Sequence, residues 1–484
     1  MLVDTVAPAA GTGARPAADR VPTARRLLAS ARTPDSTAMP LDRVVPWLAE
    51  RARVGRFQVR PVPFADLRGW YFDREDGNLR HESGRFFSVE GLHVRTDHTG
   101  GDGWRQPIIV QPEIGLLGIV AREIDGVLHF LMQAKMEPGN INTMQLSPTV
   151  QATRSNFTGV HRGRPIPYLD LFLDRGRSRV LVDVLQSEQA DWFLSKRNRN
   201  MIVEIDPDDD IETGEDFRWL TFGQLRALLS QDNVVNMDSR SILACLPTAG
   251  AEPGPLAGDV MRSFYDPHAL PLHSPSEFGS WFTGVRALRE LVRRRVPLDE
   301  VAADGWRRTD EEIAHGSGRR FRVMGADITA SNREVASWSQ PLIQPQVPGL
   351  MALLVKRIGG TLHALVQARV DVGTLNVAEL APTVHCRPAD HIGPEAEPAP
   401  PYFADALDAP AGRVLYDAMQ SEEGGRFYHA QNRYTIVRVP DGFPEQTPED
   451  YMWLTLAQLT DLLAHSNYVN VELRTLLVCA HTLY

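Results

Sequence analysis

The hydrophobic pattern of the chain is regular over most of its length and is interrupted by one strongly polar stretch, residues 133–156. This stretch follows an apolar run and places an amide, hydroxyl or charged side chain at nearly every second position. Neither a core strand nor a solvated linker requires that pattern, whereas the floor of a polar ligand site does. We therefore interpret 133–156 as the centre of a ligand site. A weaker version recurs at 367–384.

The recurrence extends over most of the chain. From Leu41 onward, the first half aligns with the second at a constant shift of 234 residues. The matches include Trp47 with Trp281, Gln133-Ala134 with Gln367-Ala368, Pro148-Thr149-Val150 with Pro382-Thr383-Val384, and Gln186-Ser187-Glu188 with Gln420-Ser421-Glu422. They indicate a tandem duplication of a unit of roughly 200 residues, which is the size of a domain rather than of a solenoid repeat. We expect a disordered or arm-like tail at 1–32, a first repeat at 33–246, a linker at 247–276 and a second repeat at 277–484.

Within each repeat, helical and strand periodicities alternate, which predicts an α+β fold. In the first repeat we expect an amphipathic helix at 42–53, a β-hairpin at 116–136 that turns at Asp125-Gly126, strands at 180–185 and 201–205, a helix capped by Thr221 that runs to Leu229, and a last helix at 241–246.

Composition and charge restrict the class of protein. The 484 residues are 43% hydrophobic and 23% charged, which is ordinary for a globular chain. A net charge of −10 gives no broad basic field for nucleic acid or an anionic membrane, and we find neither a secretory signal nor a membrane-spanning run. Three cysteines, Cys245, Cys386 and Cys479, form neither a disulfide framework nor a zinc motif. We expect a cytoplasmic protein without a nucleic-acid or membrane partner.

The duplication also shows what two diverged copies have kept. Retained positions include Gln133/Gln367, a cation at Lys135/Arg369, Gly139/Gly373, Asn142/Asn376 and Glu188/Glu422. Glycine and Pro-Thr can be retained for backbone geometry alone, whereas buried Gln, Asn and Glu need hydrogen-bond partners from the backbone or from a ligand. Because the first copy keeps more hydrogen-bonding groups, we place the working pocket there. Candidates for the second pocket are Arg369, Asn376, Thr383, Glu422, Arg426, Tyr428 and Arg433. The cluster 422–428 either belongs to a degenerate pocket or reaches across to complete the first one.

The motifs at 133–140, 145–156 and 420–428 resemble the NDP-hexose 2,3-dehydratases of deoxysugar and antibiotic biosynthesis. The resemblance covers nearly all of the chain after the tail. It implies two tandem Nudix-like domains, mixed sheets with flanking helices, a homodimer, and dTDP-4-keto-6-deoxy-D-glucose as substrate. The copy at 369–374 departs from the family motif, which favours catalysis in the first pocket. Neither half contains the acidic helix with which Nudix hydrolases hold a divalent metal.

The reaction implied by the resemblance is a β-elimination. The C4 carbonyl acidifies the C3 proton, a base removes this proton, and the C2 hydroxyl leaves to give a 3,4-diketo-2,6-dideoxy sugar. This chemistry requires a base, an acid and donors for the C4 oxygen. It needs no redox cofactor, and the sequence contains neither a GxGxxG dinucleotide turn nor a Walker loop.

Candidate roles follow from residue chemistry. Glu188 or Glu137 is the candidate base, and Lys135 can polarise the C4 carbonyl. The neutral donors proposed are Asn140, Asn142 and Thr149, the diphosphate ligands are Arg154, Arg197 and Arg199, and the aromatic side chains for thymine are Trp70, Tyr168 and Trp192. Further contacts to substrate are expected from Gln133, Gln145, Gln151, Ser155 and Asn156. Each of these residues can instead form an ordinary ion pair, strand-end hydrogen bond or core contact.

Two alternatives stay open. A metal-dependent nucleotide-sugar hydrolase would need an unrecognised carboxylate cluster, and a non-catalytic nucleotide-sugar binding protein would need no acid or base. His129 and His363 occupy equivalent hairpin positions without further ligands at suitable spacing, so we expect structural histidines and no metal site.

Overall fold

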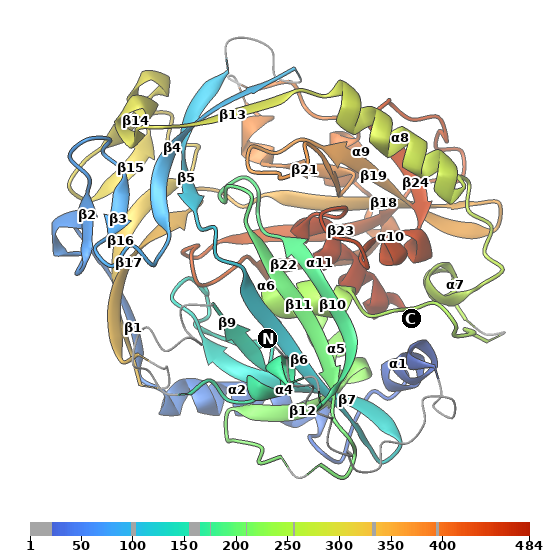
Figure 1. The fold of residues 1–484 in the computed structure, drawn as a ribbon. Helices are drawn as coiled ribbons and strands as arrows, with labels where there is room; N and C mark the ends of the chain where they lie inside the picture. The colour runs from blue at the N-terminus through green and yellow to red at the C-terminus, as the bar shows by residue number, and fades with distance from the viewer. Residues whose placement is uncertain are drawn as a thin grey trace, which may run out of the picture.

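The computed structural model describes residues 22–484 except 98–102, 154–164, 175, 210, 255–256, 332–334 and 394–395. Its described strands form two large mixed sheets and two smaller antiparallel sheets, with helices packed against them (Figure 1). The architecture is α+β, as the periodicity predicts. Among the described helices, none is both long and apolar enough to cross a membrane.

The two large sheets repeat one topology. The first contains β6 (Gly115–Ile124), β7 (Val127–Met136), β8 (Met144–Ser147), β9 (Val150–Ala152), β10 (Arg179–Ser187), β11 (Arg197–Glu204) and β12 (Phe217–Thr221). The second contains β18 (Leu350–Ile358), β19 (Thr361–Arg369), β20 (Glu379–Ala381), β21 (Val384–Cys386), β22 (Val414–Ser421), β23 (Gln431–Arg438) and β24 (Tyr451–Thr455). In each sheet one central pair is parallel, β11 with β6 and β18 with β23.

Several predicted elements are confirmed. The hairpin at 116–136 is β6 and β7, and Asp125 and Gly126 form its turn with φ of 50° and 76°. The first helix is α2 (Leu41–Val54). Thr221 caps α5 (Phe222–Leu229) by accepting a hydrogen bond from the Gln224 amide. The helix predicted at 241–246 begins earlier, as α6 (Met237–Ala244), because Asn236 caps its N-terminus.

The segments expected to be a tail and a linker both contain packed helices. α1 (Thr23–Ala31) lies in the segment expected to be a tail, and α7 (Asp259–Tyr265) lies in the expected linker. The Ser30 hydroxyl of α1 donates to the Leu128 carbonyl at 2.6 Å, and the Ser263 hydroxyl of α7 donates to the Leu362 carbonyl at 2.7 Å. Each repeat therefore begins with a short helix docked on its own large sheet. Residues 1–21 lie outside the described chain.

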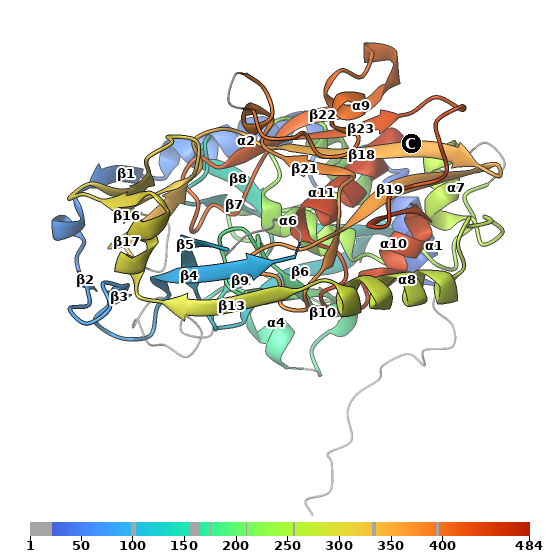
Figure 2. The same cartoon turned by 90° about the horizontal axis from the view of Figure 1, so that it is seen from above.

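The small sheets exchange strands between the repeats. β1 (Phe57–Val62) of the first repeat pairs with β16 (Arg322–Ala330) of the second, and β13 (Leu291–Val296) of the second pairs with β4 (Ser88–Thr96) of the first. Figure 2 shows β13 lying along β4. The other strands are β2 (Trp70–Phe72), β3 (Leu79–His81) and β5 (Trp104–Val110) beside β4, and β14 (Trp306–Arg308), β15 (Glu312–His315) and β17 (Ser337–Gln344) with β16. The repeats are therefore interlocked.

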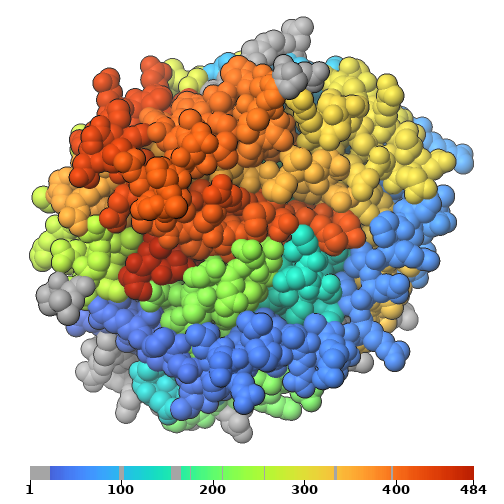
Figure 3. Space-filling view, turned by 180° about the vertical axis from the view of Figure 1, so that it is seen from behind, coloured from blue at the N-terminus to red at the C-terminus, as the bar shows by residue number. Residues whose placement is uncertain are grey.

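The remaining described helices are α4 (Asp170–Leu173), α8 (Pro275–Leu288), α9 (Phe403–Leu407), α10 (Leu456–Leu462) and α11 (Val471–Ala480), with 3-10 turns at Phe64–Asp66, Leu298–Asp304, Pro388–Asp390, Ala411–Arg413 and His481–Leu483. α6 and α11 pack together within one apolar core that both repeats share. In the view from behind, N-terminal segments (blue) and C-terminal segments (red) are both visible on the same face of the molecule (Figure 3).

Two fully buried arginines fasten the repeats to each other. Arg240 on α6 donates to the Val235 carbonyl at 2.6 Å and reaches across to the Ser421 carbonyl. Arg474 on α11 makes the equivalent bonds to the Val469 carbonyl, at 2.6 Å, and to the Ser187 carbonyl. Both cross-repeat bonds end immediately before a glutamate, Glu422 or Glu188, so they fix the backbone that presents these side chains.

Candidate active site

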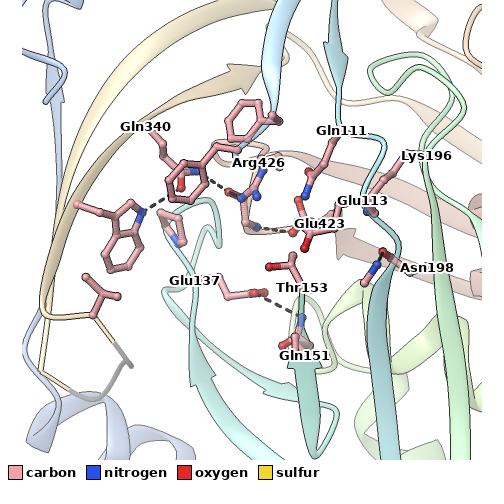
Figure 4. A pocket seen from close by; sticks show the side chains of 18 of the residues that line it. Gln111, Glu113, Glu137, Gln151, Thr153, Lys196, Asn198, Gln340, Glu423 and Arg426 are labelled. Atoms are coloured by element: carbon pink, nitrogen blue, oxygen red, sulfur yellow. Dashed lines mark hydrogen bonds between the residues drawn. The ribbon is translucent and has the colours of Figure 1, made fainter. Parts of the chain in front are cut away.

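A cavity of about 430 Å³ lies where the first large sheet meets the small sheets and a loop of the second repeat (Figure 4). The first repeat contributes its polar floor from β7, β9 and β11. The second repeat contributes β17 and the loop 423–426. The cavity is therefore built from both halves of the chain, although its floor belongs to the first.

A close backbone contact brings the loop of the second repeat to this cavity. The Gly139 amide donates to the Gly424 carbonyl at 2.7 Å, and the His429 amide donates to the Gly139 carbonyl at 2.7 Å. A Cβ atom on Gly139 would lie 1.7 Å from the Phe427 carbonyl oxygen. Gly139 is thus required for close approach of two backbones. Within the cluster 422–428, Glu423 and Arg426 line this cavity, whereas Glu422 accepts hydrogen bonds from Asn432 and Tyr434 of its own repeat.

A network of polar side chains covers one side of the cavity. The Lys135 ammonium donates to the Gln151 side-chain oxygen at 2.6 Å and lies 3.8 Å from a Glu137 carboxylate oxygen. The Gln151 amide donates to Asp238 and, at 3.4 Å, to Glu137. Burial raises the pKa of Asp238 well above its ordinary value, and the nearby carboxyls of Glu188 and Glu137 raise it further.

Glu188 is buried, with 6% of its surface exposed. The Asn198 side-chain amide donates to its Oε1 at 2.5 Å, while its Oε2 has no hydrogen-bond partner in the described chain. Burial raises the pKa of Glu188, although the positive charges of Arg474 and Lys196 and the bond from Asn198 oppose the shift. A carboxyl with a raised pKa and one unpaired oxygen is suited to accept a proton from a ligand.

Lys196 lies beside this carboxyl and donates to the Glu113 carbonyl. Burial lowers the pKa of its ammonium to about 8, against the attraction of Glu188. The loop of the second repeat adds Glu423 and Arg426. Burial raises the pKa of Glu423 to about 7, with Glu137 as the next cause, and Arg426 lies over the Phe87 ring with its guanidinium carbon 4.4 Å from the ring centroid. The lining of the cavity thus contains both carboxyl and cationic side chains.

The opposite end of the cavity is aromatic. Trp70 donates its indole N–H to the Ser339 carbonyl at 2.8 Å, and its ring packs 4.9 Å from Phe87. Phe86 and Trp338 line the same end. The other aromatic candidates have different environments. Tyr168 donates to the Glu212 carbonyl at 2.7 Å, and Trp192 packs against Phe427 at 4.5 Å.

The structure brings only some of the predicted site residues together. Lys135, Glu137, Gln151, Glu188 and Trp70 line the cavity, and so does Arg426, which we expected in the second pocket. The Asn140 amide lies nearby and donates to the Thr143 carbonyl at 3.2 Å. The assignment of Arg426 to the second pocket is therefore corrected: its loop crosses to the first repeat.

Other predicted residues hold the fold. Thr149 and its counterpart Thr383 accept from the Val120 and Leu354 amides, respectively, at 2.9 Å, and each donates to a carbonyl of the neighbouring strand. The Asn142 amide donates to the Asn233 carbonyl at 2.8 Å, while the Gln145 side chain donates to Asn142 and accepts from Ser421. These contacts satisfy the polar groups of Thr149, Gln145 and Thr383, which are buried, and of Asn142, which is exposed, without any ligand.

The remaining candidates lie elsewhere or outside the described chain. Arg199 pairs with Asp183 and Arg433 with Asp417, in partly exposed ion pairs of 2.6 and 2.7 Å. Gln133 and Arg197 are half-buried, Asn376 is exposed, and Tyr428 stacks on His429. Arg154, Ser155 and Asn156 lie outside the described residues.

The equivalent region of the second repeat is chemically different. Arg369 is paired with Asp371 at 2.6 Å and donates to the His385 carbonyl at 3.0 Å. Glu422 accepts from Asn432, Tyr434 and Gln189, each at 2.7 Å. Ala430 and Trp192 occupy the positions that correspond to Lys196 and Arg426. Its glutamate is therefore fully hydrogen-bonded, and two cations are missing.

Three residues of the cavity, Lys196, Asp238 and Glu423, were not among the predicted site residues. A signal for them exists in the duplication, because the other copy has a different residue at each position: Ala430 for Lys196, Glu472 for Asp238 and Gln189 for Glu423. Residues that both copies keep are those that the fold of each repeat requires. Residues that differ between the copies are candidates for a function that only one of the two pockets performs.

The hairpin histidines are structural, as expected. His129 bonds the Ser36 hydroxyl at 2.7 Å, and His363 accepts from the Leu272 amide at 2.9 Å. Within the described ranges, no group of three or more His, Cys, Asp or Glu side chains is arranged to hold a metal ion.

The fold and site define a duplicated α+β protein whose cavity, at the junction of its repeats, is lined by buried carboxyl and cationic groups. The family model described as NDP-hexose 2,3-dehydratase matches residues 41–246 and 275–480. The chain belongs to this family. It is 49% identical over 468 residues, 95% of each chain, to a dTDP-4-dehydro-6-deoxy-alpha-D-glucopyranose 2,3-dehydratase of Saccharopolyspora spinosa. Proteins of the same name from Amycolatopsis orientalis (48% over 462 residues, 94% of this chain and 93% of the relative) and Streptomyces violaceoruber (49% over 440 residues, 90% and 96%) are similar to it.

Proposed function

We propose that this protein is a dTDP-4-keto-6-deoxy-D-glucose 2,3-dehydratase, a hydro-lyase that releases water from C2 and C3 of its sugar. The observation that carries the proposal is the buried Glu188, which has one unpaired carboxylate oxygen in a cavity that also contains ammonium and guanidinium groups. Family membership and the names of three relatives at 48–49% identity support it.

The residues fit the steps of the elimination. Glu188 takes the C3 proton, and Lys135 stabilises the negative charge that develops on the C4 oxygen. We choose Glu188 over Glu137 as the base because Glu137 already accepts from Gln151 and lies near the Lys135 ammonium. The C2 hydroxyl leaves as water, and the resulting enol tautomerises to the 3,4-diketo-2,6-dideoxy sugar.

The remainder of the substrate is assigned by charge and shape. Arg426 and Lys196 are suited to the diphosphate because both are cationic and line the same cavity. The aromatic end, with Trp70, Phe86 and Trp338, offers flat surfaces for the thymine ring. The nucleotide then lies toward the small sheets and the second repeat, and the sugar lies over the floor of the first large sheet.

The test is to incubate the protein with dTDP-4-keto-6-deoxyglucose in D₂O, with and without EDTA, and to follow the nucleotide sugar by mass spectrometry. We expect loss of one water and deuterium incorporation at C2 during tautomerisation, both unaffected by EDTA. Release of a thymidine phosphate that EDTA abolishes would instead identify a metal-dependent hydrolase. An unchanged, bound nucleotide sugar would identify a binding protein.

We propose a homodimer in the cytoplasm that acts in deoxysugar and antibiotic biosynthesis, with repeats related to the Nudix fold. Three free cysteines support a reducing compartment. The mixed sheet of each repeat, with its central parallel pair, supports the Nudix relationship. Sedimentation analysis tests the dimer.

A further inference from the structure

Glu423 enters the first cavity from the second repeat. Its Oε1 accepts from the Gly425 amide at 2.8 Å, which fixes the side chain on its own loop. Its Oε2 is buried and has no hydrogen-bond partner among the described residues. Figure 4 shows the carboxyl directed into the cavity between Arg426 and Thr153. One oxygen is thus held, and the other is available to a ligand or a neighbouring acid.

The duplication provides an internal model for what this oxygen contacts. Gln189 occupies the equivalent position in the other repeat, and its side-chain amide donates to Glu422 at 2.7 Å. Glu422 is in turn the equivalent of Glu188. In the first cavity the corresponding pair is Glu423 and Glu188, and each of these carboxyls has an unpartnered Oε2. A protonated Glu423 has an O–H donor where Gln189 has its N–H donor. Glu423 and Glu188 can therefore form one hydrogen bond with each other if one of the two carboxyls is protonated.

The charges around the pair indicate which carboxyl holds the proton. Glu188 accepts from Asn198 and faces the positive charges of Lys196 and Arg474, which favour its carboxylate. Glu423 interacts electrostatically with three other carboxyls, those of Glu137, Glu188 and Asp238, which disfavour its ionised form. Two cations, Arg426 and Lys196, oppose this effect. Two ionised carboxylates in one dry site repel each other strongly, so one of them remains protonated.

We propose that Glu423 shares a proton with Glu188 in the resting enzyme and is the general acid that protonates the departing C2 hydroxyl. This inference rests on the proposed dehydration. Glu188 takes the C3 proton, and the C–H electron pair passes through C3 to the C4 oxygen. When the enolate collapses, a C2=C3 bond forms and the C2–O bond breaks. Its electron pair stays on the oxygen, which takes the Glu423 proton and leaves as water. The proton on Glu188 then returns to Glu423 across the pair.

The test variant is Glu423→Gln, which keeps the shape and cannot deliver a proton. The same amide is present at Gln189 in the other repeat, and circular dichroism and thermal unfolding check the fold. We expect water release to fall by about 100-fold or more, the usual contribution of a general acid. Exchange of the C3 proton with D₂O should continue, because Glu188 is intact. Glu423→Asp, which retains a carboxylic acid, should recover part of the water release.

Two outcomes would overturn the inference. Water release by Glu423→Gln within about threefold of the wild-type rate would remove Glu423 from the acid step, since a general acid normally contributes far more. Loss of C3 exchange together with water release in a folded variant would place Glu423 in the base step. The matched control is Gln189→Glu, which puts a carboxyl beside Glu422, outside the proposed active cavity, and should leave turnover unchanged. If the wild-type protein releases no water, the proposed function itself fails, which is a distinct result.

Discussion

Gly139 of the first repeat donates its amide hydrogen to the carbonyl of Gly424 in the second repeat, at 2.7 Å. The same bond recurs in the other direction, from the Gly373 amide to the Ala190 carbonyl at 2.8 Å. The first contact positions the loop that carries Glu423 and Arg426. One repeat alone therefore lacks part of the cavity, and the duplication is a requirement of the site.

Gly139→Ala should destabilise the protein and impair turnover. The added Cβ would lie 1.7 Å from the Phe427 carbonyl oxygen, so the loop must move. Overpacking of this kind costs about 1–3 kcal/mol, and a displacement of about 1 Å in a positioned group can cost about 100-fold in rate. Urea unfolding and steady-state kinetics measure the two effects.

The matched control is Gly284→Ala, in helix α8, where no described atom beyond the chain neighbours and the backbone of the helix itself lies within 4 Å of the added Cβ. It should keep full turnover and should not lose stability, because alanine favours a helix more than glycine does. Equal effects of the two substitutions would contradict the role of the Gly139 contact.

Glu188→Gln and Glu422→Gln should have opposite effects on turnover and on stability. The first removes the proposed base, so we expect kcat to fall by about 100-fold or more with little change in the midpoint of unfolding. The second weakens acceptor bonds from Asn432, Tyr434 and Gln189, so it should cost about 1–3 kcal/mol of stability and keep kcat. A larger loss of kcat in Glu422→Gln would place catalysis in the second repeat.

Arg426→Gln should raise KM for the dTDP-sugar by about tenfold to 100-fold, because a charge-assisted bond to phosphate contributes about 1.5–3 kcal/mol. Competition by dTDP against a fluorescent nucleotide measures the binding loss directly. Arg433→Gln is the control, since Arg433 forms a partly exposed ion pair with Asp417. If both variants bind dTDP like the wild type, Arg426 does not hold the diphosphate.

The duplication and most of the large-sheet elements followed from the sequence because they depend on local periodicity and on a constant shift. The strand exchange did not. β1 and β13 have the same burial pattern, so either strand fits the edge of either small sheet, and only the connections decide. Polarity drew attention to the stretch around Lys135 and Gln151, which lines the cavity. It also drew attention to Thr149, whose hydroxyl instead satisfies strand backbone. Glu423 was outside the predicted set because its role depends on a crossing loop.

The stability of the protein should fall between pH 5 and 7.5 in a manner that depends on Glu423. Its pKa is raised from 4.5 to about 7 in the folded protein, so the folded state holds a proton that the unfolded chain releases in this interval. Stability from this group is fully present below about 4.5 and is lost as the pH rises through about 7. Melting curves of the wild type and Glu423→Gln should diverge accordingly, with the wild type losing more. Histidines titrate alike in both, so parallel curves would show that Glu423 has an ordinary pKa.

Arg240→Met should be strongly destabilising, and Arg199→Met should not be. Arg240 is fully buried between α6 and α11 and bonds the carbonyls of Val235 and Ser421, so its removal leaves buried acceptors without a donor. Breaking such a buried charged network costs about 3–5 kcal/mol. Arg199 is similar in chemistry, but its ion pair with Asp183 is partly exposed and contributes about 1 kcal/mol or less. Because Arg240 joins the repeats, its loss should also separate their unfolding into two transitions in calorimetry. A single transition with an unchanged midpoint would show that the exchanged strands and the shared core hold the repeats together without it.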